Sequence, residues 1–386
     1  MLFWRRRHCC HLCLKRNSKC FVVQTTVMGF VSLVLLVCVF LMFNNHSWVL
    51  SSMVSGGHPS AGTVNHYHSK NSLPMIWALW KMIKRTMPMA QTEPELEHLS
   101  DAFQDSQRNP IVYNYIINEP EKCKGINPFL VLLVAVSPGQ SYARQAIRKT
   151  WGNETLLPGL QIVRLFLLGR DTHKNGDAEH SIKEESKHHH DIIQQSYIDN
   201  YYNLTLKTLM GMNWVATYCP HVSYVMKTDS DMFVNTEYLI KKLLMPDVPP
   251  KTNYFTGYLM RGYSPNRNKD SKWYMPPDLY PEDMYPIFCS GTGYVFSGDL
   301  AEKIFKTSLS IKRLHLEDVY VGICLANLHI DPVPPPNDSD FNHWRVSYSD
   351  CKYNQIITSH EFQPDELLKY WNQLQNNKHF CAKLAK

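Results

Sequence analysis

The sequence lacks several features that mark other protein classes. It contains no internal repeat, and neither its charge nor its composition indicates wholesale disorder. No Gly-x-x-x-x-Gly-Lys-Ser/Thr motif is present, which counts against a phosphotransferase built on a P-loop. The run His188–His190 has no spaced partner that suggests a zinc site. What remains is a chain of 386 residues, 44% of them apolar, enough for one large domain or two ordinary ones.

The net positive charge is small and unevenly placed. It amounts to +6, and part of the excess lies within the first twenty residues. A uniform basic face is therefore not indicated, and we expect no nucleic-acid partner. The basic residues of this N-terminal part are Arg5, Arg6, Arg7, Lys15, Arg16 and Lys19.

Charge is absent altogether from Phe21–Phe43, a stretch of 23 residues. This length can cross a bilayer core of about 30 Å. A cleaved signal peptide is the alternative, but its apolar part would be shorter and would end in small residues, unlike Phe40–Phe43. No basic residue follows the stretch before Lys70, so the positive-inside rule places the N-terminus in the cytosol. We predict a cytosolic tail at 1–20, a single transmembrane signal anchor at 21–43 and a lumenal or extracellular remainder.

The cysteines and the glycosylation motifs agree with that location. Six cysteines follow the apolar stretch, and they allow three disulfides in fifteen pairings, of which we assign none. Asn-x-Ser/Thr motifs predict glycosylation at Asn45, Asn153, Asn203 and Asn337.

The lumenal part divides into a stem and a globular domain. Residues 44–108 show no sustained period, and the domain is predicted at 109–386. Within it, strand-like runs at Phe129–Val136, Ile162–Leu168 and Tyr224–Lys227 alternate with helical patterns at Ala143–Trp151 and around Leu206–Trp214. This order predicts an α/β fold with a mainly parallel sheet, whose ligands bind beyond the carboxyl ends of the strands.

Two carboxylates follow the third of these runs. Asp229 and Asp231 stand one residue apart, and their hard oxygens suit Mg²⁺ or Mn²⁺. A solvated acidic turn is the alternative, but the strand-like residues before the pair and the apolar Met232-Phe233-Val234 after it indicate that the pair lies between buried segments. The similar Asp338-Ser339-Asp340 follows the proline-rich Pro332–Pro336, and we expect it to be a loop.

The second half of the domain holds further candidates, each with an ordinary structural alternative. Trp273 or Tyr274 could contact a sugar ring, although aromatic residues are more often core. The run Cys289–Tyr294 contains two glycines that allow close backbone approach to a ligand, or a strained turn. Glu317 and Asp318 precede an apolar helical run, where acids commonly cap a helix.

Four motifs follow one another along the domain: Ala143–Gly152, Lys227–Asp231, Cys289–Tyr294 and Glu317–Gly322. Together and in this order they resemble the β-1,3-galactosyltransferase family of Golgi enzymes. The resemblance runs from about Tyr113 to Gln375, which is most of the lumenal domain, and it does not include the stem.

The resemblance implies a GT-A fold, UDP-galactose as donor, a divalent metal (Mn²⁺, with Mg²⁺ as the alternative) and an acceptor that ends in β-linked N-acetylglucosamine. It implies a type II protein of the Golgi membrane that acts on glycoproteins or glycolipids. Because the donor is α-linked and the product β-linked, one inverting displacement needs a base and a charge sink for the departing UDP.

The resemblance also assigns roles to individual residues. Asp318 is the general base. Asp231, with Asp229 and His360, belongs to the metal site. The implied donor contacts are Arg144, Arg148, Lys227, Asp229, Ser230, Gly291 and Gly293, and the candidate acceptor contacts are Trp273, Tyr274 and Glu317. Transfer of N-acetylglucosamine or N-acetylgalactosamine, and sugar binding without turnover, remain the alternatives.

Overall fold

The computed structural model describes residues 113–171 and 177–384, all within one unit, Met89–Lys386. The predicted tail, membrane span and stem, and the motif at Asn45, lie outside these residues. Within the described part, none of the helices combines the length and apolarity that a membrane span requires.

The strands are β1 (Tyr115–Ile117), β2 (Leu130–Ala135), β3 (Ile162–Arg170), β4 (Ile192–Ile198), β5 (Tyr224–Asp229), β6 (Phe233–Val234), β7 (Phe255–Met260), β8 (Phe288–Ser297) and β9 (Thr358–Ser359). The helices are α4 (Ser141–Lys149), α5 (Asp177–His189), η1 (Tyr201–Asn203), α6 (Leu204–Tyr218), α7 (Thr236–Tyr238), η2 (Leu239–Leu244), α8 (Asp299–Ser308), α9 (Glu317–Asn327), α10 (Asp350–Tyr353) and α11 (Pro364–Leu384).

Seven strands form the central sheet, in the order β1-β4-β3-β2-β5-β8-β7. The pairs β4–β3, β3–β2 and β2–β5 are parallel, which confirms the predicted α/β fold and the parallel centre of its sheet. The pairs β1–β4, β5–β8 and β7–β8 are antiparallel, so the whole sheet is mixed. No helix is assigned in the described segment 261–287 between β7 and β8. Since parallel neighbours usually need a crossover helix, the antiparallel pairing of β7 and β8 follows from this connection.

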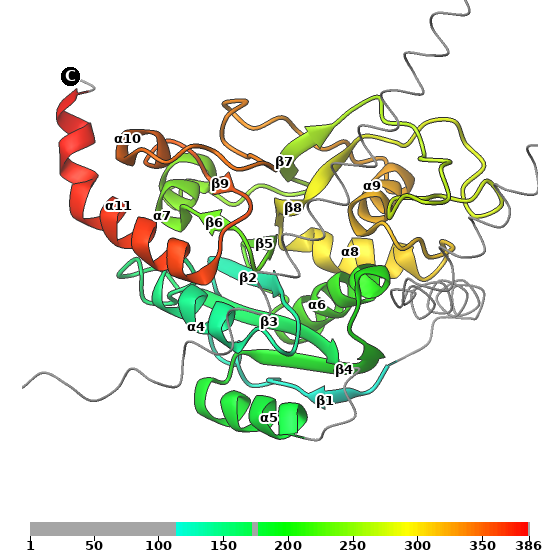
Figure 1. Ribbon diagram of the computed structural model, residues 1–386, viewed down its shortest axis with the longest axis horizontal. Helices are drawn as coiled ribbons and strands as arrows, with labels where there is room; N and C mark the ends of the chain where they lie inside the picture. Colours follow the sequence, from blue (N-terminus) through cyan, green and yellow to red (C-terminus); the bar gives the residue numbers. More distant parts are fainter. Residues whose placement is uncertain (1–112, 172–176, 385–386) are drawn as a thin grey trace, which may run out of the picture. The chain divides into compact units, whose positions relative to one another are not determined.

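Helices cover the sheet on both faces (Figure 1). Val131 and Leu133 of β2 belong to a core shared with α6, α8 and α9, whereas Leu132 and Val134 belong to the core with α4 and α11. The predicted helix around Leu206–Trp214 is α6, and it is buried on several sides, between the sheet and the helices α8 and α9. A side chain at Gly211 would collide with Leu167, so glycine there allows α6 to approach the sheet.

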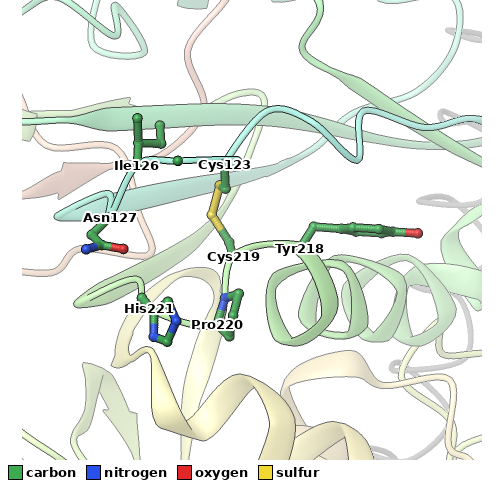
Figure 2. A pocket seen from close by; sticks show the side chains of 8 residues that line it. Cys123, Ile126, Asn127, Tyr218, Cys219, Pro220 and His221 are labelled. Carbon is green, nitrogen blue, oxygen red and sulfur yellow. A yellow bond between two sulfur atoms is a disulfide. The ribbon is translucent and has the colours of Figure 1, made fainter.

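A disulfide joins Cys123, before β2, to Cys219, after α6. Cys351 is also disulfide-bonded, whereas Cys289 and Cys324 are buried free thiols, so the three bridges that six cysteines allow are not all formed. A cavity of about 200 Å³ lies beside the Cys123–Cys219 bridge (Figure 2). The residues that line it come directly before β2 and β5 in the chain, so the cavity lies at the start of these strands, whereas Asp229 lies at the end of β5.

Candidate active site

The two carboxylates of the Asp-x-Asp motif lie where β5 ends. Asp229 is the last residue of that strand and is opposite Ala135 of β2. The side chains of Asp229 and Asp231 are 31% and 48% exposed, so both can meet a ligand from solvent. Between them, Ser230 Oγ donates to Gln140 Oε1 at 3.3 Å and so contacts the turn that follows β2. The predicted placement of this motif at a strand end is confirmed.

The other Asp-x-Asp motif is a loop, as predicted. Asp340 is buried, and its carboxylate accepts the backbone N–H of Asn337 at 3.1 Å. Its role in this loop is structural.

A short two-stranded sheet brings His360 to Asp231. β6 pairs with β9 in the register Phe233 to Ser359, so the residues flanking these strands meet. His360 Nε2 lies 3.2 Å from Asp231 Oδ2, and its Nδ1 lies 3.1 Å from the carbonyl oxygen of His343. The hydrogen bond to Asp231 raises the pKa of His360. Burial opposes ionisation of Asp231, yet the hydrogen bond from His360 lowers the pKa of Asp231.

The imidazole of His360 and the carboxylate of Asp231 are side-chain groups that commonly bind metal ions. Nδ1 donates to the His343 carbonyl and the protonated Nε2 donates to Asp231, so a metal ion would take the place of the Nε2 proton beside that carboxylate. Asp229 has a different partner, because its Oδ1 accepts from Lys227 Nζ at 2.9 Å. Among residues 113–171 and 177–384, no group of three or more His, Cys, Asp or Glu side chains is arranged to hold a metal ion.

Lys227 and Glu317 form a buried ion pair behind the exposed carboxylates. Lys227 Nζ lies 3.2 Å from Glu317 Oε2, and Tyr294 donates its hydroxyl to Glu317 Oε1 at 2.6 Å. Burial disfavours the ammonium, but the charges of Asp229 and Glu317 outweigh it and raise the pKa of Lys227. Both charged groups are buried and paired with each other, so in this arrangement neither is exposed to a ligand, and the predicted contacts of Lys227 with the donor and of Glu317 with the acceptor stay predictions.

Asp318 is the second residue of α9 and is only partly buried. Its Oδ2 accepts the backbone N–H of Gly291 at 3.1 Å, and its Oδ1 accepts that of Val319 at 2.9 Å. The N-cap position belongs to Leu316, so Asp318 is not the cap of this helix. Burial raises the pKa of Asp318, although the backbone hydrogen bonds oppose that effect.

Gly291 and Gly293 lie within β8, in neither a loop nor a strained turn. A Cβ at Gly291 would lie 3.0 Å from Glu317 Oε2, so glycine lets α9 begin directly beside the strand. Gly293 is opposite Thr228 in the sheet and is buried there.

The predicted donor contacts Arg144 and Arg148 are engaged elsewhere. Arg144 forms two hydrogen bonds with Glu185 and donates to the carbonyls of Ser137 and Pro138. Arg148 forms a bidentate pair with Asp191 at 2.8 Å for both bonds. Both guanidinium groups are buried, and their carboxylate partners lie on or beside α5. The pattern of strand-like and helical runs in the sequence did not predict this helix. In this arrangement neither arginine is free to contact the donor directly, and their predicted role in donor binding stays a prediction.

An aromatic and basic surface lies beside Asp318. Trp273 is 54% exposed and Tyr201 38% exposed, and Lys272 Nζ lies 4.9 Å and 5.6 Å from their ring centroids. Burial, followed by the charge of Asp318, raises the pKa of Tyr201 to about 12, so its hydroxyl stays protonated near that carboxylate. Tyr274 is partly buried. Tyr201, which precedes α6, was not predicted to lie in the site, because its neighbours in sequence carry no signal of its exposure.

The three described glycosylation motifs lie on loops or a short turn. Asn337 is exposed, whereas Asn153 and Asn203 are partly buried. Asn203 already donates its side-chain amide to the carbonyl of Ile198 at 2.9 Å.

The sequence comparisons agree on one family, and one relative matches along the whole chain. A protein-family model described as Galactosyltransferase matches residues 142–336, which include Asp229, Asp231 and Asp318. The Homo sapiens Beta-1,3-galactosyltransferase 2 is 58% identical over 410 residues that cover 100% of this chain and 97% of that protein. The Mus musculus Beta-1,3-galactosyltransferase 1 is 53% identical over 273 residues, which cover 70% of this chain and 81% of that protein. A solved glycosyltransferase involved in the glycosylation of the major capsid of PBCV-1 is 12% identical, covers 64% of this chain and 100% of that chain, and has a TM-score of 0.33.

Proposed function

This chain belongs to the β-1,3-galactosyltransferase family, and on that basis we propose that it transfers galactose from UDP-galactose to the 3-hydroxyl of a terminal β-linked N-acetylglucosamine. The observation that carries the proposal is the meeting of three carboxylates at one edge of the sheet. Asp229 and Asp231 follow β5, and Asp318 begins α9, which is joined to the same region through Gly291. This arrangement supports a GT-A type fold, in which the nucleotide sugar binds beyond the carboxyl ends of parallel strands.

The residues beside Asp231 fit a divalent metal ion. A carboxylate oxygen and an imidazole nitrogen lie 3.2 Å apart on a partly exposed surface, so both can turn toward one ion. Carboxylate oxygens suit both Mg²⁺ and Mn²⁺, whereas imidazole is a ligand of transition metals, which favours Mn²⁺ over Mg²⁺. When bound, the metal would neutralise charge on the diphosphate of the donor. Asp231 and His360 would hold it, with Asp229 close by on the donor side.

Asp318 is proposed as the general base. Its carboxylate takes the proton of the acceptor hydroxyl while that oxygen forms a bond with the anomeric carbon of galactose. The bond from this carbon to the diphosphate oxygen breaks, and its electron pair leaves with UDP. The displacement inverts the anomeric centre and needs no covalent intermediate. A raised pKa suits Asp318 for this role, because a stronger base accepts the proton more readily.

The surfaces on either side of these carboxylates supply the remaining contacts. Ser230, partly exposed beside Gln140, is proposed as a donor contact. Trp273 and Tyr201 are proposed to bind the apolar face of an acceptor sugar, because they are exposed, adjacent to Lys272 and near Asp318.

We also propose that the protein is a type II protein of the Golgi membrane. The uncharged stretch 21–43 and the basic residues before it support this orientation. The acceptors would then be lumenal glycoproteins or glycolipids.

The test is a panel of sugar nucleotides offered to the detergent-solubilised full chain with one N-acetylglucosamine-terminated acceptor. Galactose transfer from UDP-galactose with a β1,3 linkage is the expected result. Preference for UDP-N-acetylglucosamine or UDP-N-acetylgalactosamine would refute the donor. Binding of UDP-galactose without transfer or hydrolysis would instead identify a sugar-binding protein without turnover.

A further inference from the structure

Lys227 lies at the centre of a buried cluster that joins β5, β8 and α9. Its Nζ donates to Asp229 Oδ1 at 2.9 Å, to the carbonyl oxygen of Gly291 at 2.5 Å and to Glu317 Oε2 at 3.2 Å. An ammonium group has three protons, and these three acceptors occupy all of them. Lys227 therefore acts on ligands only through the residues that it holds.

Gly291 is held on both sides of its Cα. Its carbonyl accepts from Lys227, and its N–H donates to Asp318 Oδ2 at 3.1 Å. Glu317, the residue before Asp318, is bound to Lys227 through one oxygen and to the Tyr294 hydroxyl through the other. A continuous set of hydrogen bonds thus runs from the donor-side carboxylate Asp229 to Asp318.

The side chains of Glu317 and Asp318 lie so close to Gly291 that a side chain at this position would displace them. A Cβ there would lie 3.0 Å from Glu317 Oε2 and 3.4 Å from both Cβ and Oδ2 of Asp318. Lys227 and Glu317 are 90 residues apart in sequence, so no local backbone connection sets the distance between their elements.

We infer that Lys227 is a positioning residue that sets the separation between the donor-side carboxylate Asp229 and the base Asp318. This inference rests on the proposed function. In a single displacement, the donor and the acceptor hydroxyl must be held at reacting distance, and a misplacement of about 1 Å can cost about 10²-fold in rate. Hydrolysis of the donor needs the metal side of the site but no positioned acceptor sugar, because water can approach freely.

The test compares two rates on the same full-length protein: galactose transfer to the acceptor, and hydrolysis of UDP-galactose. Lys227→Met alone would leave Glu317 buried without a counter-ion and endanger folding. The double variant Lys227→Met/Glu317→Gln removes both charges, and Gly291→Ala tests the same geometry without changing charge. We expect the ratio of transfer to hydrolysis to fall at least about 10-fold in both.

Two controls separate positioning from general damage. Arg164→Met removes a buried cation that, like Lys227, binds both a carboxylate and a backbone carbonyl. Its partners are Asp191 and the carbonyl of Gly152. Gly139→Ala adds a methyl group where no atom lies within 4 Å. Neither should change the ratio.

A ratio within about twofold of wild type in folded Lys227→Met/Glu317→Gln and Gly291→Ala would overturn the inference. So would equal losses of both rates, which a merely structural role predicts. Failure of the wild-type chain to transfer galactose at all would refute the proposed function itself, and is recognised before any variant is compared.

Discussion

Replacing Asp318 by asparagine separates the two roles that this residue can have. If it is the base, Asp318→Asn should lower galactose transfer by about 10²–10⁴-fold, the usual contribution of a general base. If it only holds the backbone of Gly291 and Val319, the effect should be limited to stability. The two expectations differ enough to be measured with one protein.

The structural part of the effect follows from its two hydrogen bonds. Asparagine keeps one acceptor oxygen but presents an amide group at the other position, so one of the bonds at 3.1 and 2.9 Å is lost. A hydrogen bond to a charged group contributes about 1.5–3 kcal/mol. Because burial raises the pKa of Asp318, removal of the charge offsets part of this loss. A domain stable by about 5–15 kcal/mol remains folded at 25 °C after such a change.

The assay therefore has three readouts on the purified full chain. Transfer of labelled galactose should collapse, the affinity for UDP-galactose should stay near wild type, and the melting temperature should fall by only about 4–8 °C.

Asp340→Asn is the matched control. Like Asp318, Asp340 has a pKa that burial raises and accepts a backbone N–H, yet it lies in the Asp338–Asp340 loop. Transfer by Asp318→Asn within about 10-fold of wild type, similar to Asp340→Asn, would refute the assignment of Asp318 as the base.

Four further predictions follow from the site and its surroundings. Asp231→Asn, or excess chelator with the wild type, should abolish transfer while the far-ultraviolet circular dichroism stays unchanged; full activity would exclude the metal role. The raised pKa of Asp318 means that transfer should fall with decreasing pH at a value above that of an ordinary aspartate, and a pH–rate profile without this acid limb would contradict it. Burial opposes ionisation of Asp191, but Arg148 and Arg164 outweigh it and lower the pKa of this carboxyl group. The stability that Asp191 contributes is therefore complete above its pKa in the unfolded chain, about 3.9, and is lost as the pH falls through its lower pKa in the folded protein. Asp191→Asn should therefore cost about 3–5 kcal/mol at pH 7 and reduce acid sensitivity, as urea titrations at pH 7 and pH 3 would show. UDP-galactose should give a higher rate than UDP-N-acetylglucosamine, and the reverse order in a competition assay would exclude galactose as the preferred sugar.

Much of the fold was readable because burial leaves a periodic trace in sequence. The strand-like runs at Phe129–Val136 and Tyr224–Lys227 predicted two central parallel strands, β2 and β5. The antiparallel pairing of β8 was not predicted, because strand direction depends on how the long connection from β7 returns. The buried surroundings of α6 were missed for a similar reason, since they depend on α8 and α9.

For the site, the sequence alone determined which acids could do chemistry. Asp229, Asp231 and Asp318 were identified from their residue type, their flanking apolar segments and a family resemblance. Only the tertiary structure decided which charged groups are free to meet a ligand. It pairs Arg144 and Arg148 with carboxylates of a distant segment, and it surrounds Lys227 with three acceptors. The physical reason is that the free energy of a charge depends on its partners and its exposure to water, and both are set by contacts between residues far apart in the chain.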